Sequence, residues 1–323
     1  MKYGQVAGIE KPISRLVQGM VQVPRGSDAQ DAAGLALLDA ALAAGITTFD
    51  TAQVYGKDAF LGRWIASRGV REQVAIIAKG AHHNEVRKRV TPFDIASDLH
   101  DTLAHMKTPY IDIFVLHRDD PEYPVEPIVD ALNAHIREGK IRAFGASNWS
   151  TTRLQAANDY AAASGQAPFA LSSPQFSLAD QKVEPWPGCI SITGASREAE
   201  RRWYAEHHVP VFAWSSMAGG FLSGRFVPGN ELTFTDYFDQ VAVQCYASPD
   251  NYERVNRARE IAERHGLTMP QIALAYVFNY PLDIYALVGS ATPEEVAANV
   301  VALNTGLTAQ EMAYLDLHTD TPD

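Results

Sequence analysis

The sequence predicts a (β/α)8 barrel of the TIM type, formed by a single domain spanning residues 1–323. A short apolar or β-branched run followed by an amphipathic helical stretch recurs about eight times. No linker or low-complexity segment separates these repeats, which favours one closed barrel over a doubly wound open sheet. Polar residues also stand directly after several apolar runs, where the strand ends of such a barrel form the active-site face.

The expected elements follow from these patterns. Helix boundaries are marked by Ser150 or Thr151 as a cap, by Thr292 with Pro293, and by the closing glycines Gly45 and Gly139. The expected strands are 16–19, 46–50, 74–79, 111–117, 141–147, 170–175, 209–214 and 284–289. The expected helices include 28–44, 92–106, 127–138, 152–163, 198–207, 270–279 and 293–303.

Two segments depart from the simple alternation. Residues 6–16 are expected to form a short N-terminal β-hairpin that closes the opposite end of the barrel. The connection after the seventh strand, residues 215–249, forms a loop too long for a simple turn, and long loops in compact domains are usually lids or mobile segments. Its aromatic residues are Phe221, Phe226, Phe234, Tyr237, Phe238 and Tyr246.

Composition limits the class of protein. There are 27 Lys and Arg against 38 Asp and Glu, and the net charge of −11 disfavours binding to nucleic acid or an anionic membrane. No apolar run approaches the roughly 18 residues of a membrane span, and no secretory signal is visible. We expect a cytoplasmic enzyme with a small-molecule substrate; oligomeric state does not follow from these features. Cys189 and Cys245 are expected as buried free thiols, with a disulfide between them as the alternative.

Four polar residues suggest a proton-transfer site: Asp50, Tyr55, Lys79 and His117 follow apolar runs. General acid catalysis at neutral pH needs a donor whose pKa is moved toward the working pH, and a tyrosine, near 10 when unperturbed, needs a neighbouring cation for this. Lys79 can be that cation, and Asp50 would keep it charged. His117 could hold the substrate oxygen or share the proton.

Each of these residues alone has a simpler interpretation. Asp50 could cap a turn, Tyr55 could pack at a rim, and His117 could be a satisfied buried histidine. Lys79 could be a solvated charge or a Schiff-base lysine of an aldolase on the same fold. The four together, in this order, are more specific than any one of them.

The contexts GITTFDTAQVYG, AIIAKG and IDIFVLHRDDP resemble the aldo-keto reductases, most closely an aryl-alcohol dehydrogenase-like bacterial branch. The resemblance covers essentially the whole chain and includes GKIRAFGASNW, SSPQFSL, VFAWSSMAGGFLSG and VGSATPEEVAANV. It implies a barrel that uses NADP(H) or NAD(H) to interconvert an aldehyde or ketone and an alcohol. By that likeness Tyr55 is the proton donor, Lys79 lowers its pKa, Asp50 pairs with Lys79, and His117 orients the carbonyl.

The same likeness implies a set of cofactor residues. Ser147, Asn148 and Gln175 end two strands where they could fix a nicotinamide carboxamide, and Trp214, a tyrosine in much of the family, would stack on the ring. No GxGxxG motif is present. Small residues in the 215–224 segment would let backbone amides approach a pyrophosphate, and the N-terminus of the last helix would favour an anion. The further cofactor residues are Ser215, Met217, Gly219, Gly224, Gly289, Ser290, Thr292, Glu295 and Asn299.

Glu295 changes the expectation about which dinucleotide the protein uses. The family often places Arg or Gln there, and Arg clamps the 2′-phosphate of NADPH. A carboxylate would repel that phosphate and could accept a hydrogen bond from a ribose hydroxyl, so we expect dual or NAD-leaning use.

The expected substrate contacts are Val21, Arg118 and Trp149, together with Tyr55 and His117. Residues 20–24 and the long aromatic connection would add pocket walls. The pairs His82–His83 and His207–His208 lack a supporting metal-ligand pattern and are expected at the surface without a metal. An alternative function is a nicotinamide-nucleotide-sensing regulatory subunit with little turnover.

Overall fold

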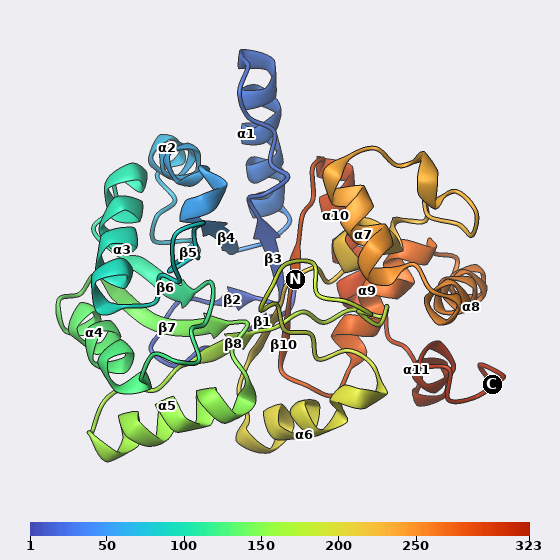
Figure 1. Cartoon of the computed structure of the whole chain (residues 1–323). Coiled ribbons are helices and arrows are strands. Elements are labelled where there is room, and N and C mark those ends of the chain that lie inside the picture. The colour runs from blue at the N-terminus through green and yellow to red at the C-terminus, as the bar shows by residue number, and fades with distance from the viewer.

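The computed structural model describes residues 1–323 and contains a closed barrel of eight parallel strands, which confirms the predicted fold class. The strands follow one another around the barrel in chain order, and β10 closes it by pairing with both β9 and β3. Figure 1 shows the helices arranged around these strands. The strands are β3 (Leu16–Gly19), β4 (Thr48–Ala52), β5 (Ala75–Gly80), β6 (Ile111–Leu116), β7 (Ile141–Ser147), β8 (Leu171–Ser173), β9 (Val211–Ala213) and β10 (Ile284–Val288).

The helices connect and cover the strands. Ser150 caps α5 by accepting a hydrogen bond from the Arg153 amide at 3.2 Å, and Thr292 caps α10 in the same way. Gly45 and Gly139 have φ of 89° and 71°, the left-handed conformation in which glycine ends a helix without strain. The helices are α1 (Asp28–Ala43), α2 (Asp58–Arg68), α3 (Pro92–Met106), α4 (Val125–Arg137), α5 (Thr151–Ala163), α6 (Glu198–His207), α7 (Tyr237–Tyr246), α8 (Pro249–His265), α9 (Met269–Asn279), α10 (Pro293–Asn304) and α11 (Ala309–Leu315).

Some boundaries differ from the sequence prediction. β8 and β9 are each three residues long instead of six, because Pro174 and Pro210 lack the N–H group that a ladder requires. Gln175 and Trp214 therefore lie beyond the regular strands and are joined by an isolated bridge. Helices α2, α7, α8 and α11 were not anticipated.

Strand residues alternate between two cores. On β5, Ile76 and Ala78 pack outward against the helices, whereas Ala75 and Ile77 point into the barrel. The same alternation on the other strands fills the interior with a separate cluster of apolar side chains. This interior cluster consists of Val6, Ile13, Val17, Ala75, Ile77, Ile113, Val115, Ala143, Leu171, Phe212, Tyr285 and Leu287.

An N-terminal hairpin is present, as predicted, but its first strand lies upstream of residues 6–16. Strand β1 (Tyr3–Gly4) pairs antiparallel with β2 (Ile13–Ser14). Val6 and Ile13 are buried in the interior cluster of the barrel. Figure 1 draws this hairpin at the centre of the ring of helices. Because Ile13 precedes the amino end of β3, the hairpin closes the end of the barrel opposite the strand carboxyl ends.

The connection after β9 is more ordered than expected. It contains two short 3₁₀ segments, η3 (Ala218–Ser223) and η4 (Glu231–Thr233), followed by α7. Phe226 stacks on Phe221 and on Phe234, with ring centroids 5.6 Å and 4.2 Å apart. Phe221, Phe226 and Tyr246 are therefore part of the main core and Phe234 packs against it, whereas Tyr237 and Phe238 are exposed.

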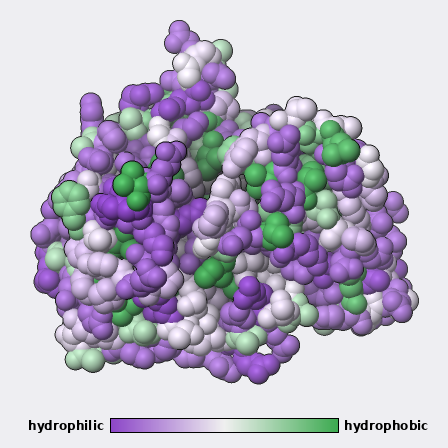
Figure 2. All heavy atoms as spheres, viewed as in Figure 1, coloured by the Kyte–Doolittle hydropathy of each residue, from purple (hydrophilic) through white to green (hydrophobic).

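The surface in the view of Figure 2 is largely hydrophilic, with apolar atoms in separate patches. None of the helices is both long enough and apolar enough to cross a membrane.

Candidate active site

The alternation of side chains along the strands brings the predicted catalytic residues together. Ile77 points into the barrel, so Lys79, two residues later, points the same way at the carboxyl end of β5. Val115 and His117 are related in the same manner on β6. Asp50 lies on β4, next to β5 in the barrel, and its Cα pairs with that of Ile77. Three polar side chains thus converge above the apolar interior.

Asp50 and Lys79 form an ion pair that is almost completely removed from solvent. Both carboxylate oxygens of Asp50 accept hydrogen bonds from Lys79 Nζ, and the side chains are 5% and 4% exposed, respectively. Burial alone lowers the pKa of Lys79, but Asp50 and Tyr55 more than offset this, so the pKa of Lys79 is raised. Lys79 is therefore a fixed positive charge at neutral pH.

Tyr55 lies beside this charge. It ends a short 3₁₀ segment, η1 (Gln53–Tyr55), which the left-handed Gly56 terminates. Lys79 Nζ is 5.5 Å from the centroid of the Tyr55 ring. The segment is anchored on both sides, because the buried carboxylate of Asp58 accepts hydrogen bonds from the Thr51 and Thr102 hydroxyls at 2.8 Å and 3.2 Å.

The pKa of Tyr55 is set by opposing effects. Burial raises it, Lys79 and Arg118 lower it, and Asp50 raises it again. The net direction is upward, which differs from the lowered pKa expected from the sequence, because the desolvation of this half-buried side chain outweighs the neighbouring cations. The phenol therefore keeps its proton at neutral pH, and the cations favour the phenolate that forms once the proton is donated.

His117 completes the group. Its ring packs edge-on against Tyr55 with centroids 5.7 Å apart, and burial, together with Lys79, His82 and Arg118, places the pKa of His117 well below its usual value. The imidazole is therefore neutral, and its buried Nδ1 has no hydrogen-bond partner. Because Nδ1 is enclosed, the other ring nitrogen, Nε2, is the one that can hold a substrate oxygen or exchange a proton with it.

His82 was expected at the surface, and this expectation is wrong. It is half-buried, and its ring packs against His117 with centroids 4.8 Å apart. Its Nδ1 lies 2.7 Å from the His83 carbonyl oxygen. The sequence did contain a signal that could have placed His82 in the site. His82 lies three residues after Lys79, and the carboxyl end of β5 leads directly into the site. His207 and His208 are exposed, as expected.

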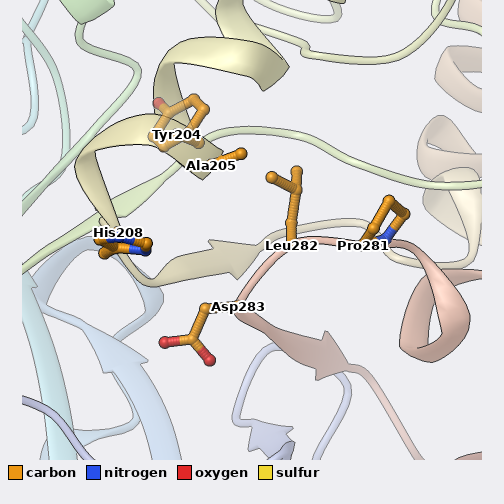
Figure 3. A pocket seen from close by; sticks show the side chains of 6 residues that line it. All are labelled: Tyr204, Ala205, His208, Pro281, Leu282 and Asp283. Atoms are coloured by element: carbon orange, nitrogen blue, oxygen red, sulfur yellow. The ribbon is translucent and has the colours of Figure 1, made fainter.

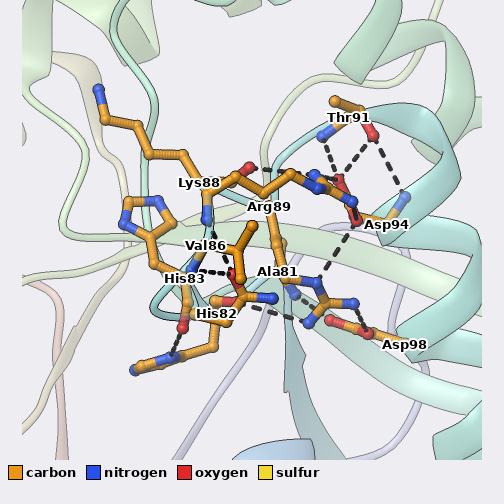
Figure 4. Close-up of polar contacts among 11 residues, drawn as sticks. Ala81, His82, His83, Val86, Lys88, Arg89, Thr91, Asp94 and Asp98 are labelled. Atoms are coloured by element: carbon orange, nitrogen blue, oxygen red, sulfur yellow. Dashed lines mark hydrogen bonds and ion pairs between the residues drawn. The ribbon is translucent and has the colours of Figure 1, made fainter.

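The loop that carries His82 is held by buried carboxylates at the start of α3 (Figure 4). Asp98 accepts hydrogen bonds from the Ala81 amide at 2.8 Å and from Arg89 at 2.5 Å. Asp94 pairs with Arg87; burial opposes ionisation, but Arg87 and Thr91 outweigh it and lower the pKa of Asp94 to about 2. The loop is thereby fixed relative to β5 although it is not part of the barrel.

The residues expected to hold a carboxamide lie together above β7 and β8. Asn148 donates to the His117 carbonyl and to Ser147 Oγ, and its own oxygen accepts from the Ile190 amide at 3.0 Å. Gln175 contacts Ser177 and Ser191. These amides are already engaged within the protein, so a bound carboxamide would share or exchange existing hydrogen bonds.

Trp214 and the segment after it provide an aromatic face and a strained backbone. Trp214 is half-buried, and its buried Nε1 has no partner. Ser215, Ala218, Gly219, Gly220 and Gly224 all have φ between 49° and 98°. Left-handed residues interspersed in a short segment can turn backbone N–H groups toward one point, the arrangement that binds anions. Met217, half-buried, lies within this segment.

Residues 289–299 include the turn after β10 and the start of α10. Asn299 donates to Ser290 Oγ at 3.1 Å, and Gly289 lies next to Gln22, so that an added Cβ would be 3.2 Å from Gln22 Cγ. The Glu295 carboxylate accepts a hydrogen bond from the Ala291 amide at 2.8 Å. The negative charge of Glu295 therefore already lies at the end of the helix where an anion would bind.

The three expected substrate contacts differ in exposure. Val21 is 38% exposed, Arg118 is 7% exposed, and Trp149 is 1% exposed. The Trp149 indole packs against Phe169 and donates a hydrogen bond to the Arg118 carbonyl at 3.3 Å. Trp149 is thus part of the core between barrel and helices and supports Arg118, which corrects its expected place in the pocket wall.

Other features lie outside this group. Cys189 and Cys245 are free thiols, but only Cys245 is buried. No group of three or more His, Cys, Asp or Glu side chains is arranged to hold a metal ion.

A hollow of about 450 Å³ lies where the chain enters β9 and β10, at the opposite end of the barrel (Figure 3). Its one carboxylate, Asp283, pairs with Arg15, so this hollow offers no comparable chemistry.

The buried ion pair leads to a stability prediction. Lys79→Met should lower the free energy of unfolding by about 3–5 kcal/mol because it leaves Asp50 buried without a partner. The double variant Asp50→Asn, Lys79→Met should recover most of that loss. Urea unfolding at pH 7 measures both. Arg202→Met, which breaks an exposed pair with Glu198, is the control and should change little. Equal losses in the single and double Lys79 variants would contradict the coupling.

The neutral His117 leads to a pH prediction. Its pKa is depressed in the folded protein, so below its usual value of 6.5 the unfolded chain binds more protons. The free energy of unfolding should therefore fall as the pH drops below about 6.5. Above pH 6.5, His117 should contribute nothing to the dependence of this free energy on pH. His117→Asn should reduce the slope by up to about 1.4 kcal/mol per pH unit. The control is His208→Asn at an exposed position, which should keep the slope of the wild type. An unchanged slope in His117→Asn would contradict the neutral state of His117 in the folded protein.

Comparisons with known proteins agree with this arrangement. The model of the Aldo/keto reductase family matches residues 15–320. An uncharacterized oxidoreductase of Bacillus subtilis (strain 168), YrpG, is 24% identical over 98% of this chain and 95% of its own. The fold is similar to that of a glycerol dehydrogenase from Gluconobacter oxydans, with a TM-score of 0.77, 22% identity, and coverage of 97% of this chain and 93% of that one. It is also similar to a thermostable aldo-keto reductase in complex with the inhibitor epalrestat, with a TM-score of 0.73, 22% identity, and coverage of 99% and 100%. The chain belongs to the aldo/keto reductase family.

Proposed function

We propose that this protein is an NAD(P)(H)-dependent oxidoreductase that interconverts an aldehyde or ketone and the corresponding alcohol, with Tyr55 as the general acid. The observation that carries the proposal is the position of the Tyr55 phenol beside the buried Asp50–Lys79 pair and the neutral His117. The family generally uses a nicotinamide dinucleotide. The fold neighbour described as a glycerol dehydrogenase is in keeping with carbonyl and alcohol chemistry.

The roles of the four residues follow from their charges. Tyr55 donates its proton to the carbonyl oxygen as negative charge develops there, and His117 holds the same oxygen without competing as a cation. Lys79 stabilises the resulting phenolate, since its attraction lowers the cost of ionising Tyr55. Asp50 keeps Lys79 charged and fixed. In the alcohol-oxidising direction Tyr55 takes the proton back.

The bound nicotinamide would supply or accept the hydride. The residues fit such a group, because Trp214 presents a half-buried ring with an unpartnered Nε1, and the following segment has the left-handed backbone typical of anion sites. Ser147, Asn148 and Gln175 would hold its carboxamide. Ser290, Thr292 and Asn299 would hold the distal part at the start of α10.

The state of Lys79 argues against a Schiff-base aldolase. An amine must be neutral to attack a carbonyl, and catalytic Schiff-base lysines have lowered pKa values. The pKa of Lys79 is raised, and both oxygens of Asp50 hold its ammonium group. Lys79 is therefore suited to electrostatic stabilisation and not to nucleophilic attack.

Removal of one hydroxyl tests the role of Tyr55. Tyr55→Phe should lower kcat for aldehyde reduction by about 10²–10⁴ because the proton donor is lost, while binding of NADH and NADPH is retained. The assay follows nicotinamide absorbance, and dinucleotide binding is followed by fluorescence. Tyr160→Phe, which removes an exposed hydroxyl on α5, is the control and should keep full turnover.

Turnover of Tyr55→Phe within tenfold of the wild type would reject the assignment. Tight dinucleotide binding without turnover of any carbonyl by the wild type would instead favour a nucleotide-sensing regulatory subunit.

Glu295 leads to a prediction about cofactor preference. Its negative charge at the start of α10 disfavours the 2′-phosphate of NADPH, so the wild type should use NADH at least as well as NADPH. Glu295→Gln keeps an oxygen that can accept the Ala291 amide and should shift the kcat/KM ratio toward NADPH by about threefold to tenfold. Glu294→Gln, one residue earlier, is the matched control. A hundredfold preference of the wild type for NADPH would contradict this role of Glu295.

A further inference from the structure

We propose that Arg118 binds a carboxylate of the substrate, so that the preferred substrates are carbonyl compounds carrying an acid group. This inference rests on the proposed function, because it concerns the substrate of the same site. Arg118 directly follows His117 at the end of β6 and is 7% exposed. Arginine is seldom buried to this extent unless an anion accompanies it.

The structure contains no anion for Arg118. Its only hydrogen bond to another side chain joins Nη1 to Cys189 Sγ at 2.7 Å, and no ion pair includes it. Burial raises the pKa of the Cys189 thiol, which is therefore neutral and does not balance the charge. A guanidinium has five N–H donors, so most of its hydrogen-bonding capacity is unused. The Nε and Nη2 atoms have no hydrogen-bond partner, and neither is fully enclosed by protein, so both can reach a ligand.

The carboxylates nearest in sequence are engaged elsewhere. Asp119 pairs with Arg153 at 2.6 Å, and Asp120 pairs with Lys88 at 2.8 Å. Other cations beside the site are also paired, since Lys79 binds Asp50 and Arg89 binds Asp98. Figure 4 shows the pair of Arg89 and Asp98. Arg25, on the loop after β3, and Lys57, just after Tyr55, also lack an acidic partner, but they are more exposed and bind the Gly56 and Val23 carbonyls. Arg118 is therefore the buried cation at this mouth that lacks an acidic partner, and one monoanionic carboxylate would balance it.

The backbone of Arg118 is held in place before any ligand binds. Trp149 donates to its carbonyl oxygen at 3.3 Å, and the Arg153 guanidinium lies 4.6 Å from the Trp149 ring centroid. The neighbouring amide of His117 donates to the Gly80 carbonyl at 2.8 Å. Because the backbone is already fixed, only the side chain of Arg118 has to be ordered when an anion binds, which favours binding.

The position of Arg118 favours the substrate over the cofactor phosphates as its partner. The expected phosphate segments follow β9 and β10, and β10 lies directly across the eight-stranded barrel from β6. Arg118 instead lies close enough to Tyr55 and His117 to affect the pKa of both side chains. A molecule whose carboxylate binds Arg118 can therefore present its carbonyl group to Tyr55.

The test compares paired aldehydes that differ only in charge. Suitable pairs are 4-carboxybenzaldehyde with 4-formylbenzamide, and 4-oxobutanoate with 4-oxobutanamide, at pH 7. We expect the wild type to prefer the acid of at least one pair by tenfold or more in kcat/KM, mainly through a lower KM. Arg118→Met should remove about 10- to 100-fold of that preference, because a charge-assisted hydrogen bond is lost. Because Arg118 also lowers the pKa of Tyr55, kcat should fall for the acid and the amide alike, so the acid-to-amide ratio is the readout. Arg118→Lys should keep part of the preference.

The control is Lys88→Met, which removes a nearby cation that already has a partner and should leave the acid-to-amide ratio unchanged. Binding of benzoate and benzamide, measured by calorimetry, gives a readout independent of turnover, and only benzoate binding should weaken in Arg118→Met. Equal use of acid and amide in every pair, or the same ratio in wild type and Arg118→Met, would overturn the proposal for Arg118. If the proposed redox function itself were wrong, neither member of any pair would be reduced.

Discussion

The buried ion pair between Asp50 and Lys79 is the interaction on which the candidate site depends. Two charges with side chains only 5% and 4% exposed persist there because each is the partner of the other. Lys79 thereby becomes a permanent charge beside a phenol and an imidazole that are half-buried. Its field opposes the effect of burial on Tyr55 and adds to the effect of burial on His117. One lysine therefore favours the phenolate of Tyr55 and the neutral form of His117.

The barrel creates this arrangement through the two-residue period of its strands. The interior cluster supports the site from below, and on several strands a later inward position carries a polar residue in place of an apolar one. Asp50, Lys79, His117 and Ser147 occupy such positions on four consecutive strands. Gln175 and Trp214 continue the pattern where prolines have already interrupted regular pairing. The loops therefore have to position only Tyr55 and the groups around it.

Much of this could be predicted from the sequence because local signals determine it. Apolar runs identified the eight strands, and the polar residues after them identified the candidate site. The prediction failed where tertiary packing decides the outcome. The net pKa of Tyr55 depends on how completely the phenol is buried, and the place of Trp149 depends on its contact with Phe169. His82 was missed because its contact with His117 joins two loops. Arg118 was identified as a residue near the substrate, but its lack of an acidic partner is visible only once Asp119 and Asp120 are seen to pair elsewhere.

The most direct test of the coupling between Lys79 and Tyr55 is a titration of the phenol itself. Replacing Tyr55 with 3,5-difluorotyrosine, which ionises more readily, allows ¹⁹F NMR to follow its ionisation in the wild-type background and in Lys79→Met. We expect deprotonation to require a higher pH in Lys79→Met, because the cation that opposes the effect of burial is removed. The same titration midpoint in both proteins, or a lower one in the variant, would show that Lys79 does not control the proton of Tyr55.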